Sequence, residues 1–259
     1  MTPIAELSER LRSYYTAYYR DVLAIPDWLT LVELRQDEET RLEAAHLDRV
    51  RRVAGADALV GRILNVGCGT GGFNVLASTA GAQTVGIDES WEAIAICGLK
   101  AAKAGGAFLQ AHSERLPFCD GAFDFVYCFS VIEHVHSVEE SIHEIVRVTR
   151  PGGVIYLHTA NAWSWYEGHY KLLWVPFLPR AIARMYLWLR ARPTAYLDTL
   201  LRLTPGRLAT AFRAAGIPAL EFLDNDRPRE SRGPLWPLLR IYYALTGVTP
   251  FIEIVARKP

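Results

Sequence analysis

A short apolar run that leads directly into a glycine-rich turn constrains the fold of this chain more than any other feature. Residues 62–66 (RILNV) suit a buried strand, and four glycines follow within 67–72. Glycine adopts positive φ without a steric penalty and lets backbone amides approach a ligand closely. A second apolar run, 83–88, ends in Asp88, where an acid can accept the ribose hydroxyls of a nucleoside. This order of strand, glycine loop, helix, strand and acid predicts a nucleoside-cofactor site.

Strand-like and helix-like segments alternate over residues 61–160. Helical segments include 91–104 and a helix that begins at the capping box of residues 137–140. This alternation implies right-handed crossovers and a mainly parallel sheet. We therefore predict an α/β fold with a doubly wound, mainly parallel sheet. Its expected strands lie at 62–66, 83–88, 123–129, 153–159, 219–223 and 250–256.

The composition divides the chain into three parts. Residues 1–60 predict an N-terminal helical cap, because apolar side chains recur at three- and four-residue spacing and Gly55 ends the second helix. Residues 61–160 and 204–259 predict the core, in which Thr204 caps a helix that runs to Ala215. An aromatic-rich, helical insertion, 161–203, separates the two core segments. We expect a loop between the last two strands, which carries three prolines and the arginines Arg227, Arg229 and Arg232.

Composition also excludes several classes of protein. Lysine plus arginine and aspartate plus glutamate each number 28, so the basic excess of a nucleic-acid binder is missing. The four cysteines form no CxxC pair, which favours free thiols in a reducing compartment. The N-terminus lacks the apolar core of a secretory signal, and prolines and arginines interrupt the apolar stretch 171–189. We expect a cytoplasmic protein; its oligomeric state cannot be read from the sequence.

Four segments, taken together, resemble the class I S-adenosylmethionine-dependent methyltransferases. They are LNVGCGTGG (64–72), VGIDES (85–90), ERLPFCDGAFDFVYCFSVIEHV (114–135) and RPGGVIYLHT (150–159). The resemblance covers about residues 60–160 and is closest to small-molecule enzymes of the ubiquinone-biosynthesis type. It implies a Rossmann-like sheet of seven strands, S-adenosylmethionine as cofactor and S-adenosylhomocysteine as product.

The resemblance also implies roles for individual residues. The methionine part of the cofactor would lie against the glycine loop, the ribose at the acid after the second strand, the adenine after the third strand, and the sulfonium at the end of the 123–129 strand. At the glycine loop these residues are Asn65, Gly67, Cys68, Gly69 and Gly71, and at the acid they are Asp88 and Glu89. After the third strand they are His112, Ser113 and Glu114, and at the end of the 123–129 strand they are Phe129 and Ser130. Two positions depart from the family: Asn65 stands where an acid is usual and cannot pair with the cofactor ammonium, and His112 stands where Asp is frequent.

His134 is the leading candidate for a catalytic base, because an oxygen acceptor usually needs one. The alternative is that Glu133 and His134 stabilise the start of a helix and orient the neighbouring loops. In the ubiquinone O-methyltransferases, two acids and a histidine spaced Glu-x-x-Glu-His can bind magnesium. Here Ser130 replaces the first acid, and one carboxylate with one imidazole is a poor site for a hard cation. We therefore predict no metal.

The acceptor is expected to contact residues after the 153–159 strand and in the insertion. The candidates are His158, Asn161, Tyr166 and His169. The insertion combines many aromatic side chains with six basic and two acidic residues. It can serve as a lid over an apolar acceptor, as a peripheral membrane contact through 163–203, or as a subdomain that packs on the N-terminal helices. We expect a small, apolar, aromatic or lipid-linked acceptor, methylated at oxygen.

Three other functions remain open from the sequence. A non-catalytic S-adenosylmethionine-binding or scaffold protein would keep the same fold. A nicotinamide-dependent oxidoreductase is supported only by the Gly67-x-Gly69-x-x-Gly72 spacing. Methylation of nucleic acid or protein ranks lower, because the Asn/Asp-Pro-Pro-Tyr/Phe signature of amino-methylating DNA enzymes is missing after residue 129.

Overall fold

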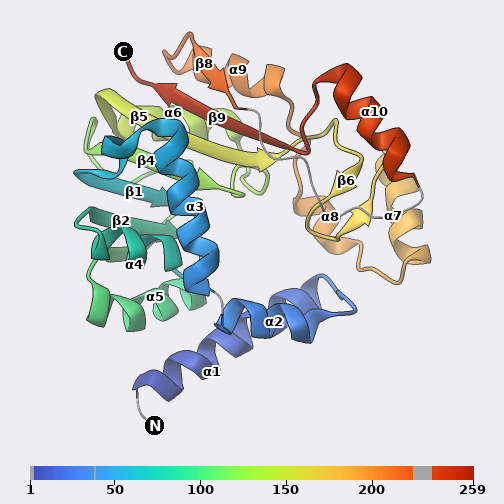
Figure 1. Cartoon of the computed structure of the whole chain (residues 1–259), viewed down its shortest axis with the longest axis horizontal. Coiled ribbons are helices and arrows are strands. Elements are labelled where there is room, and N and C mark those ends of the chain that lie inside the picture. The colour runs from blue at the N-terminus through green and yellow to red at the C-terminus, as the bar shows by residue number, and fades with distance from the viewer. Residues whose placement is uncertain (1–2, 38, 224–234) are drawn as a thin grey trace.

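A seven-stranded sheet forms the centre of the protein, with the strand order β3-β2-β1-β4-β5-β9-β8 (Figure 1). The computed structural model describes residues 3–37, 39–223 and 235–259. All neighbouring strands pair in parallel except at β9, which runs antiparallel to both β5 and β8. This confirms the predicted doubly wound, mainly parallel sheet. The strands are β1 (Arg62–Val66), β2 (Gln83–Asp88), β3 (Ala107–Gln110), β4 (Phe123–Phe129), β5 (Thr149–Ala160), β8 (Leu220–Phe222) and β9 (Phe251–Arg257).

The central strands are apolar on both faces, as strands covered by helices on both sides must be. In β1, Ile63 belongs to the cluster on one face, whereas Leu64 belongs to the cluster on the other. The same alternation places Phe125 and Val126 of β4 on opposite faces. Helices α3, α4 and α5 cover the first face, and α6 and α9 cover the second. These helices are α3 (Glu39–Ala54), α4 (Gly72–Thr79), α5 (Trp91–Ala104), α6 (Val138–Val148) and α9 (Pro205–Ala214).

Side-chain caps fix where three of these helices begin. Ser90 Oγ, Ser137 Oγ and Thr204 Oγ1 each accept a hydrogen bond from the backbone N–H three residues later, at 3.2 Å in each case. Each bond satisfies an amide that has no partner within the helix. The predicted helices at 91–104, after residue 137 and after Thr204 are confirmed.

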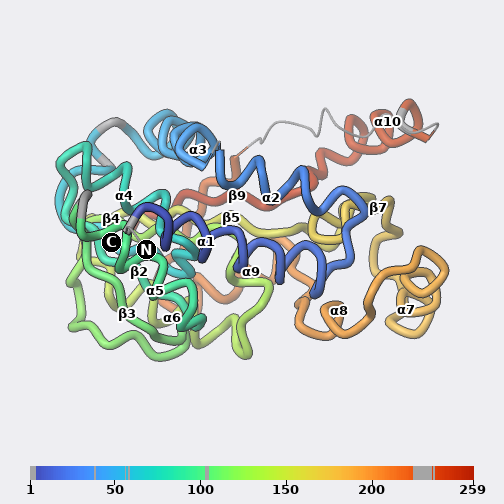
Figure 2. The backbone as a smooth tube through the Cα atoms, turned by 90° about the horizontal axis from the view of Figure 1, so that it is seen from below, coloured from blue at the N-terminus to red at the C-terminus, as the bar shows by residue number. Residues whose placement is uncertain are grey.

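The N-terminal segment and the insertion pack into one shared core. The segment contains α1 (Pro3–Thr16), a π-helical turn (Ala17–Val22) and α2 (Trp28–Asp37), which precede α3. Its buried Tyr15, Leu23 and Val32 belong to the same apolar cluster as Tyr170 and Leu187 of the insertion. Figure 2 shows α1 running along the molecule from the sheet toward the insertion. The sequence did not predict α2, because only Val32 of that helix is buried and its apolar periodicity is weak.

The insertion contains more than the expected helices. Residues 166–173 form a two-stranded hairpin, β6 (Tyr166–Glu167) and β7 (Leu172–Leu173), ahead of α7 (Arg180–Leu189) and α8 (Ala195–Thr199). One side of α7 is buried at Ala183 and Leu187. Its opposite side is exposed at Ile182, Met185, Trp188 and Leu189.

The prediction of a loop between the last two strands is wrong for residues 236–246, which form helix α10 (Trp236–Thr246). Pro237 lies in the first turn of α10, where the missing N–H costs nothing. Leu238, Ile241 and Leu245 of this helix are exposed whereas Leu239 and Tyr243 are buried, so apolar side chains lie on both its exposed and its buried side. Arg227, Arg229 and Arg232 lie outside the described residues. Within the described part of the chain, no helix has both the length and the apolar character to cross a bilayer.

Candidate active site

The glycine loop between β1 and α4 has a backbone that other residues adopt poorly. The φ angles of Gly67, Gly69 and Gly71 are +67°, +52° and +77°. A Cβ atom on Gly67 would lie 2.1 Å from Cγ2 of Val131, so only glycine fits there. A Cβ on Gly69 would meet no atom within 4 Å. The loop is thus tight at Gly67 and open at Gly69, next to the partially positive N-terminus of α4.

Asp88 joins the end of β2 to this loop. Its Oδ2 accepts a hydrogen bond from the Gly69 N–H, and its Oδ1 accepts one from the Ser90 N–H, both at 2.9 Å. Burial raises the pKa of Asp88, although these two donors oppose the shift. A carboxylate has about four acceptor positions, so two bonds leave room for further donors such as ribose hydroxyls.

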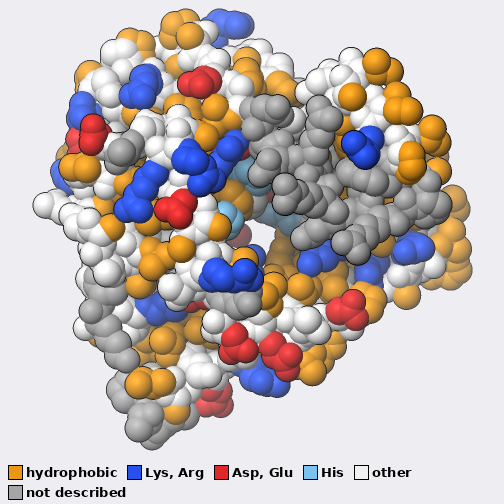
Figure 3. Space-filling view, viewed as in Figure 1, with side chains coloured by type: hydrophobic (Ala, Val, Ile, Leu, Met, Phe, Trp, Pro, Cys, Tyr) orange, Lys and Arg blue, Asp and Glu red, His pale blue; other side chains and the backbone are white. Residues whose placement is uncertain are grey.

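A cavity of about 630 Å³ opens in front of the loop, and we call it the main cavity. Figure 3 shows the molecule hollowed between the sheet core and the insertion, with histidine side chains at the hollow. The cavity is lined by the glycine loop, the tyrosines of α1, the ends of β4 and β5, and the insertion. Its volume falls in the range of cofactor and ligand sites.

A chain of hydrogen bonds attaches the N-terminal helices to the loop. Tyr15 Oη and Thr70 Oγ1 lie 2.9 Å apart, and Thr70 Oγ1 donates to Oε1 of Glu39 at 2.6 Å. Lys100 Nζ donates to the same carboxylate, at 2.6 and 2.7 Å. Two segments of the cap, α1 and α3, are therefore bonded to the loop at one residue, Thr70.

Four ionisable side chains gather on the insertion side of the main cavity, and we call them the Glu–His cluster: Glu133, His134, Glu167 and His169. His169 Nδ1 lies 2.8 Å from Glu167 Oε1, and its Nε2 lies 3.9 Å from Glu133 Oε1. The His134 and His169 rings are 5.1 Å apart and nearly perpendicular. Glu133 Oε2 accepts a hydrogen bond from Thr159 Oγ1 at 2.7 Å. The Nδ1–Glu167 contact places a proton on Nδ1 and leaves Nε2 as the basic nitrogen.

The two histidines of the cluster differ in basicity. Burial and the nearby His169 lower the pKa of His134 to about 4. Burial alone would also lower the pKa of His169, but the hydrogen bond to Glu167 and the charges of Glu167 and Glu133 raise it above its ordinary value. Burial raises the pKa of Glu133. His169 is therefore the stronger base of the pair.

Stacked rings form the wall at the ends of β4 and β5. The Phe129 ring lies 4.1 Å from the His158 ring and 4.5 Å from the His46 ring, between centroids. Burial lowers the pKa of His158 to about 4, so this histidine is neutral near pH 7. Ser130 follows Phe129 with a φ of +55°, and its N–H donates to the His158 carbonyl at 2.8 Å. The Phe129 and His158 rings therefore give this wall a flat, uncharged surface.

Comparisons with known proteins identify the family. A profile described as "Methyltransferase domain" matches residues 64–157. The chain is 28% identical over 200 residues to the ubiquinone biosynthesis O-methyltransferase of Aromatoleum aromaticum, covering 76% of this chain and 79% of that protein. It is 31% identical over 211 residues to the demethylmenaquinone methyltransferase of Parafrankia sp., covering 71% of this chain and 82% of the relative. The chain belongs to the class I S-adenosylmethionine-dependent methyltransferases.

Other relatives match a shorter part of this chain. Two uncharacterised methyltransferases of Mycobacterium leprae are 36% identical over 99 residues, which is 37% of their length. Among solved structures, an S-adenosylmethionine-dependent methyltransferase from Mesorhizobium loti superposes with a TM-score of 0.54 at 19% identity, covering 76% of this chain and 90% of that one. This structural likeness shows the fold. The nicotinamide alternative, which depended on glycine spacing alone, is set aside.

The residues around the loop fit the cofactor that this family uses. S-adenosylmethionine supplies an activated methyl group, and Gly69 leaves open space beside the backbone where its methionine part would lie. Asp88 has acceptor capacity left for the ribose. Asn65 lines the main cavity and is buried, with its Nδ2 donating to Asn74 Oδ1 at 2.6 Å. Asn74 Nδ2 is buried without a partner in the described structure. Cys68 is buried, with its Sγ 4.0 Å from Cys97 Sγ.

Glu89 and the three residues proposed for the adenine end differ in their exposure and in their contacts. Glu89 and His112 are exposed, and His112 Nδ1 lies 3.8 Å from Glu89 Oε2. Ser113 and Glu114 instead face α6: Ser113 Oγ contacts Ser141 Oγ at 2.9 Å, and Glu114 Oε1 accepts the His136 N–H at 2.7 Å. Ser113 and Glu114 therefore support the start of α6, whereas Glu89 and His112 remain accessible.

The four candidate acceptor residues divide between two cavities. His158 lines the main cavity, Asn161 and Tyr166 line a second cavity inside the insertion, and His169 lines both. Asn161 already has backbone partners, donating to the Thr249 carbonyl and accepting from the Trp163 N–H. Its side chain thus orders the start of the insertion.

The sequence argument against a metal counted too few groups. Glu133, His134 and His169 each place a ligand-type atom within 4.8 Å of the others. The count was incomplete because His169 reaches this place only when the insertion folds over the core. Glu133 and His169 already bond to Thr159 and Glu167, and the absence of a metal remains a prediction.

Sequence reasoning missed several residues of the site. Glu167, the partner of His169, and Glu39 and Lys100 at the loop carry no local motif. Their positions depend on contacts between distant segments. Tyr14 and Tyr15 of α1 and Tyr18 and Tyr19 of the π-helical turn line the main cavity, and this group of hydroxyls is a local signal that could have indicated a ligand site.

Proposed function

We propose that this methyltransferase transfers a methyl group to a hydroxyl oxygen of a small, apolar acceptor, with His169 as the general base. The observation that carries the proposal is His169, which lines the main cavity on the insertion side and is held from behind by Glu167. A hydroxyl is a weak nucleophile until it loses its proton, and a positioned base contributes about 10²–10⁴-fold. The relative from Aromatoleum aromaticum, named as a ubiquinone biosynthesis O-methyltransferase, supports transfer to oxygen.

In this reaction, His169 Nε2 takes the hydroxyl proton while the oxygen forms a bond to the methyl carbon. S-adenosylmethionine, when bound, would supply the methyl group; its sulfur would keep the electron pair of the broken carbon–sulfur bond and leave as S-adenosylhomocysteine. Glu167 holds the His169 tautomer through Nδ1 and stabilises the imidazolium that forms. Holding the reacting atoms about 3–3.5 Å apart and in line supplies most of the remaining rate enhancement.

The walls of the main cavity favour an apolar, flat acceptor. The Phe129 and His158 rings form one side, and Tyr14 of α1 and Tyr18 of the π-helical turn form another. Burial raises the pKa of Tyr18 to about 12, so this phenol remains neutral and can donate a hydrogen bond to a carbonyl or hydroxyl. A phenol, catechol or quinol fits these walls.

A pH–rate profile tests the assignment of the base. The protein is assayed with S-adenosylmethionine and a panel of catechols and hydroquinones, and S-adenosylhomocysteine binding is measured by calorimetry. Because the pKa of His169 is raised, we expect the rate to rise with pH through a value above about 6.5 and then to level off. His169→Asn should lose about 10²–10⁴-fold in kcat.

Two further variants separate the alternatives. Glu167→Gln should lower kcat and move the acid limb to lower pH, whereas His134→Asn should leave the limb in place. A limb near pH 4 that disappears in His134→Asn would instead make His134 the base. Binding of S-adenosylhomocysteine without methylation of any hydroxyl would favour the scaffold function.

A further inference from the structure

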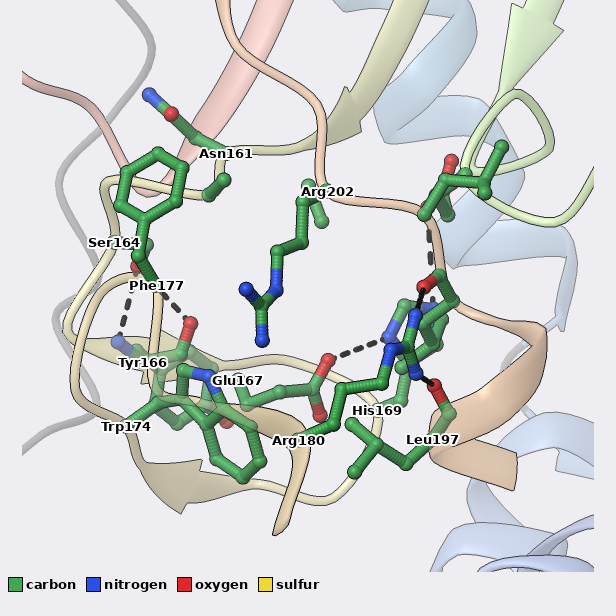
Figure 4. Close-up of a pocket in the computed structure, with 15 residues that line it drawn as sticks. Asn161, Ser164, Tyr166, Glu167, His169, Trp174, Phe177, Arg180, Leu197 and Arg202 are labelled. Atoms are coloured by element: carbon green, nitrogen blue, oxygen red, sulfur yellow. Dashed lines mark hydrogen bonds and ion pairs between the residues drawn. The ribbon is translucent and has the colours of Figure 1, made fainter. Parts of the chain in front are cut away.

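A second cavity of about 80 Å³ lies inside the insertion, and we call it the insertion cavity. Glu133 and His169 line both it and the main cavity, so their side chains form the boundary between the two. Trp174, Phe177 and leucines form apolar walls, and two arginines, Arg180 and Arg202, are among its lining residues (Figure 4). Two guanidinium groups in a small cavity next to the proposed base need a chemical explanation.

Arg202 is held on an anchored piece of backbone and extends into the space. The neighbouring Leu201 N–H donates to the Glu133 carbonyl at 2.7 Å, and the Leu203 carbonyl accepts from the Ala162 N–H at 2.8 Å. The Arg202 guanidinium donates to the Leu178 carbonyl. Figure 4 shows this group near the middle of the cavity. Arg202 is exposed and forms no ion pair with a carboxylate of the described residues, so several of its five N–H donors face solvent and are free for a ligand that enters there.

Arg180 is fixed in orientation at the first residue of α7. Its two terminal nitrogens donate to the carbonyls of Leu197 and Leu200, and Asp198 lies 3.5 Å away. These bonds hold the plane of the guanidinium without using all of its donors. The carbonyls act as a support that keeps the positive charge at the wall.

The other polar groups of this cavity already have partners. Glu167 accepts from His169 at 2.8 Å and from the Tyr170 N–H at 2.6 Å. Ser164 Oγ donates to the Tyr166 carbonyl and accepts from the Tyr166 N–H, both at 3.0 Å. Glu133 and Glu167 also line the cavity and keep acceptor positions, so the free donors of the two guanidinium groups are the part of the lining that favours an anion.

We propose, on the basis of the proposed function, that the insertion cavity binds an acidic group of the methyl acceptor, a carboxylate or a phosphate, between Arg180 and Arg202. A cavity volume of about 80 Å³ is sufficient for such a group. Trp174 and Phe177 would cover the apolar part that joins it to the reacting hydroxyl. Anchoring the acceptor on the far side of His169 fixes which hydroxyl faces the base, so these arginines determine acceptor specificity.

Calorimetry with matched probes tests this inference. Benzoate, phenyl phosphate and the neutral benzyl alcohol are titrated into the full-length protein saturated with S-adenosylhomocysteine. We expect both anions to bind more tightly than the alcohol, and the stronger of the two identifies the acidic group. Arg202→Met should weaken anion binding by about tenfold or more, and Arg202→Lys should be intermediate because it keeps the charge but loses the planar donors. Arg190→Met, at the residue that follows α7 and does not line the cavity, is the matched control and should change nothing.

The outcomes are decisive in each direction. Equal binding of benzyl alcohol and the anions to the wild-type protein overturns the inference. Anion preference that survives in Arg202→Met also overturns it, because the anion would then bind elsewhere. S-adenosylhomocysteine affinity and the melting temperature, measured for each variant, show that the fold and cofactor site remain intact. A wild-type protein that fails to bind S-adenosylhomocysteine contradicts the proposed function and is recognised before any anion is added.

Discussion

Replacing Gly67 with alanine tests whether the glycine loop is set by steric contact as well as by backbone conformation. The positive φ of +67° costs an L-residue about 1–2 kcal/mol. The new Cβ would also lie 2.1 Å from Cγ2 and 3.0 Å from Cγ1 of Val131, and overpacking of this kind costs about 1–3 kcal/mol. Together these effects predict a loss of about 2–5 kcal/mol in the free energy of unfolding.

Gly69→Ala is the matched control, because its φ of +52° carries the same backbone penalty while its Cβ meets no atom within 4 Å. It should lose only about 1–2 kcal/mol. Val131→Ala removes both Cγ atoms, so adding it to Gly67→Ala should recover the steric part. The free energy of unfolding is measured by urea denaturation for the wild type, the three single variants and the Gly67/Val131 double variant.

The size of the coupling between the two positions decides the question. A double-mutant cycle should give a coupling energy of about 1–3 kcal/mol between positions 67 and 131. Equal losses for Gly67→Ala and Gly69→Ala, with no coupling to position 131, would refute the steric argument and leave only the backbone effect.

Three other perturbations follow from the structure. Glu253 is buried, and burial raises its pKa, but two hydrogen bonds from Arg49, at 2.8 and 2.9 Å, lower the pKa overall, so the stability that Glu253 contributes is present above its unfolded pKa and lost as pH falls through the folded value. Glu253→Gln should therefore cost about 3 kcal/mol near pH 7, and urea denaturation at a series of pH values should show a smaller loss of stability toward acid pH than in the wild type. If no metal takes part, dialysis against EDTA should leave methyl transfer unchanged, and recovery of lost activity on adding a single divalent ion would contradict this. Peripheral membrane contact through 163–203 remains a prediction; flotation with phosphatidylglycerol vesicles should detect it, and Trp188→Ser, at a side chain that is 74% exposed, should weaken it without changing the melting temperature.

The core could be predicted from the sequence because its signals are local. The glycine loop, the acid at Asp88 and the cap residues Ser137 and Thr204 each specify their own element through nearby backbone groups. The strands were recognisable because both of their faces are buried, which produces continuous apolar runs.

The remainder depends on contacts that no short window of sequence contains. His169 was identified as an acceptor contact, but its partner Glu167 and its approach to Glu133 require the insertion to fold back over the ends of the strands. Glu39 meets Thr70 only through the packing of α3 beside the loop. Helix α10 escaped prediction for a different reason, since the prolines and arginines of its segment favoured a loop and its apolar side chains lie on both the exposed and the buried side.

The shared core of the N-terminal helices and the insertion has a consequence for exchanging parts between relatives. Tyr15, Leu23 and Val32 pack in the same cluster as Tyr170 and Leu187, although nearly the whole sheet separates them along the chain. The insertion is therefore not a transferable module by itself. A chimera that imports a new acceptor-binding insertion has to import residues 3–36 with it, or the graft will present an apolar surface to a cap that no longer matches. In such a protein, acceptor range and the N-terminal sequence change together.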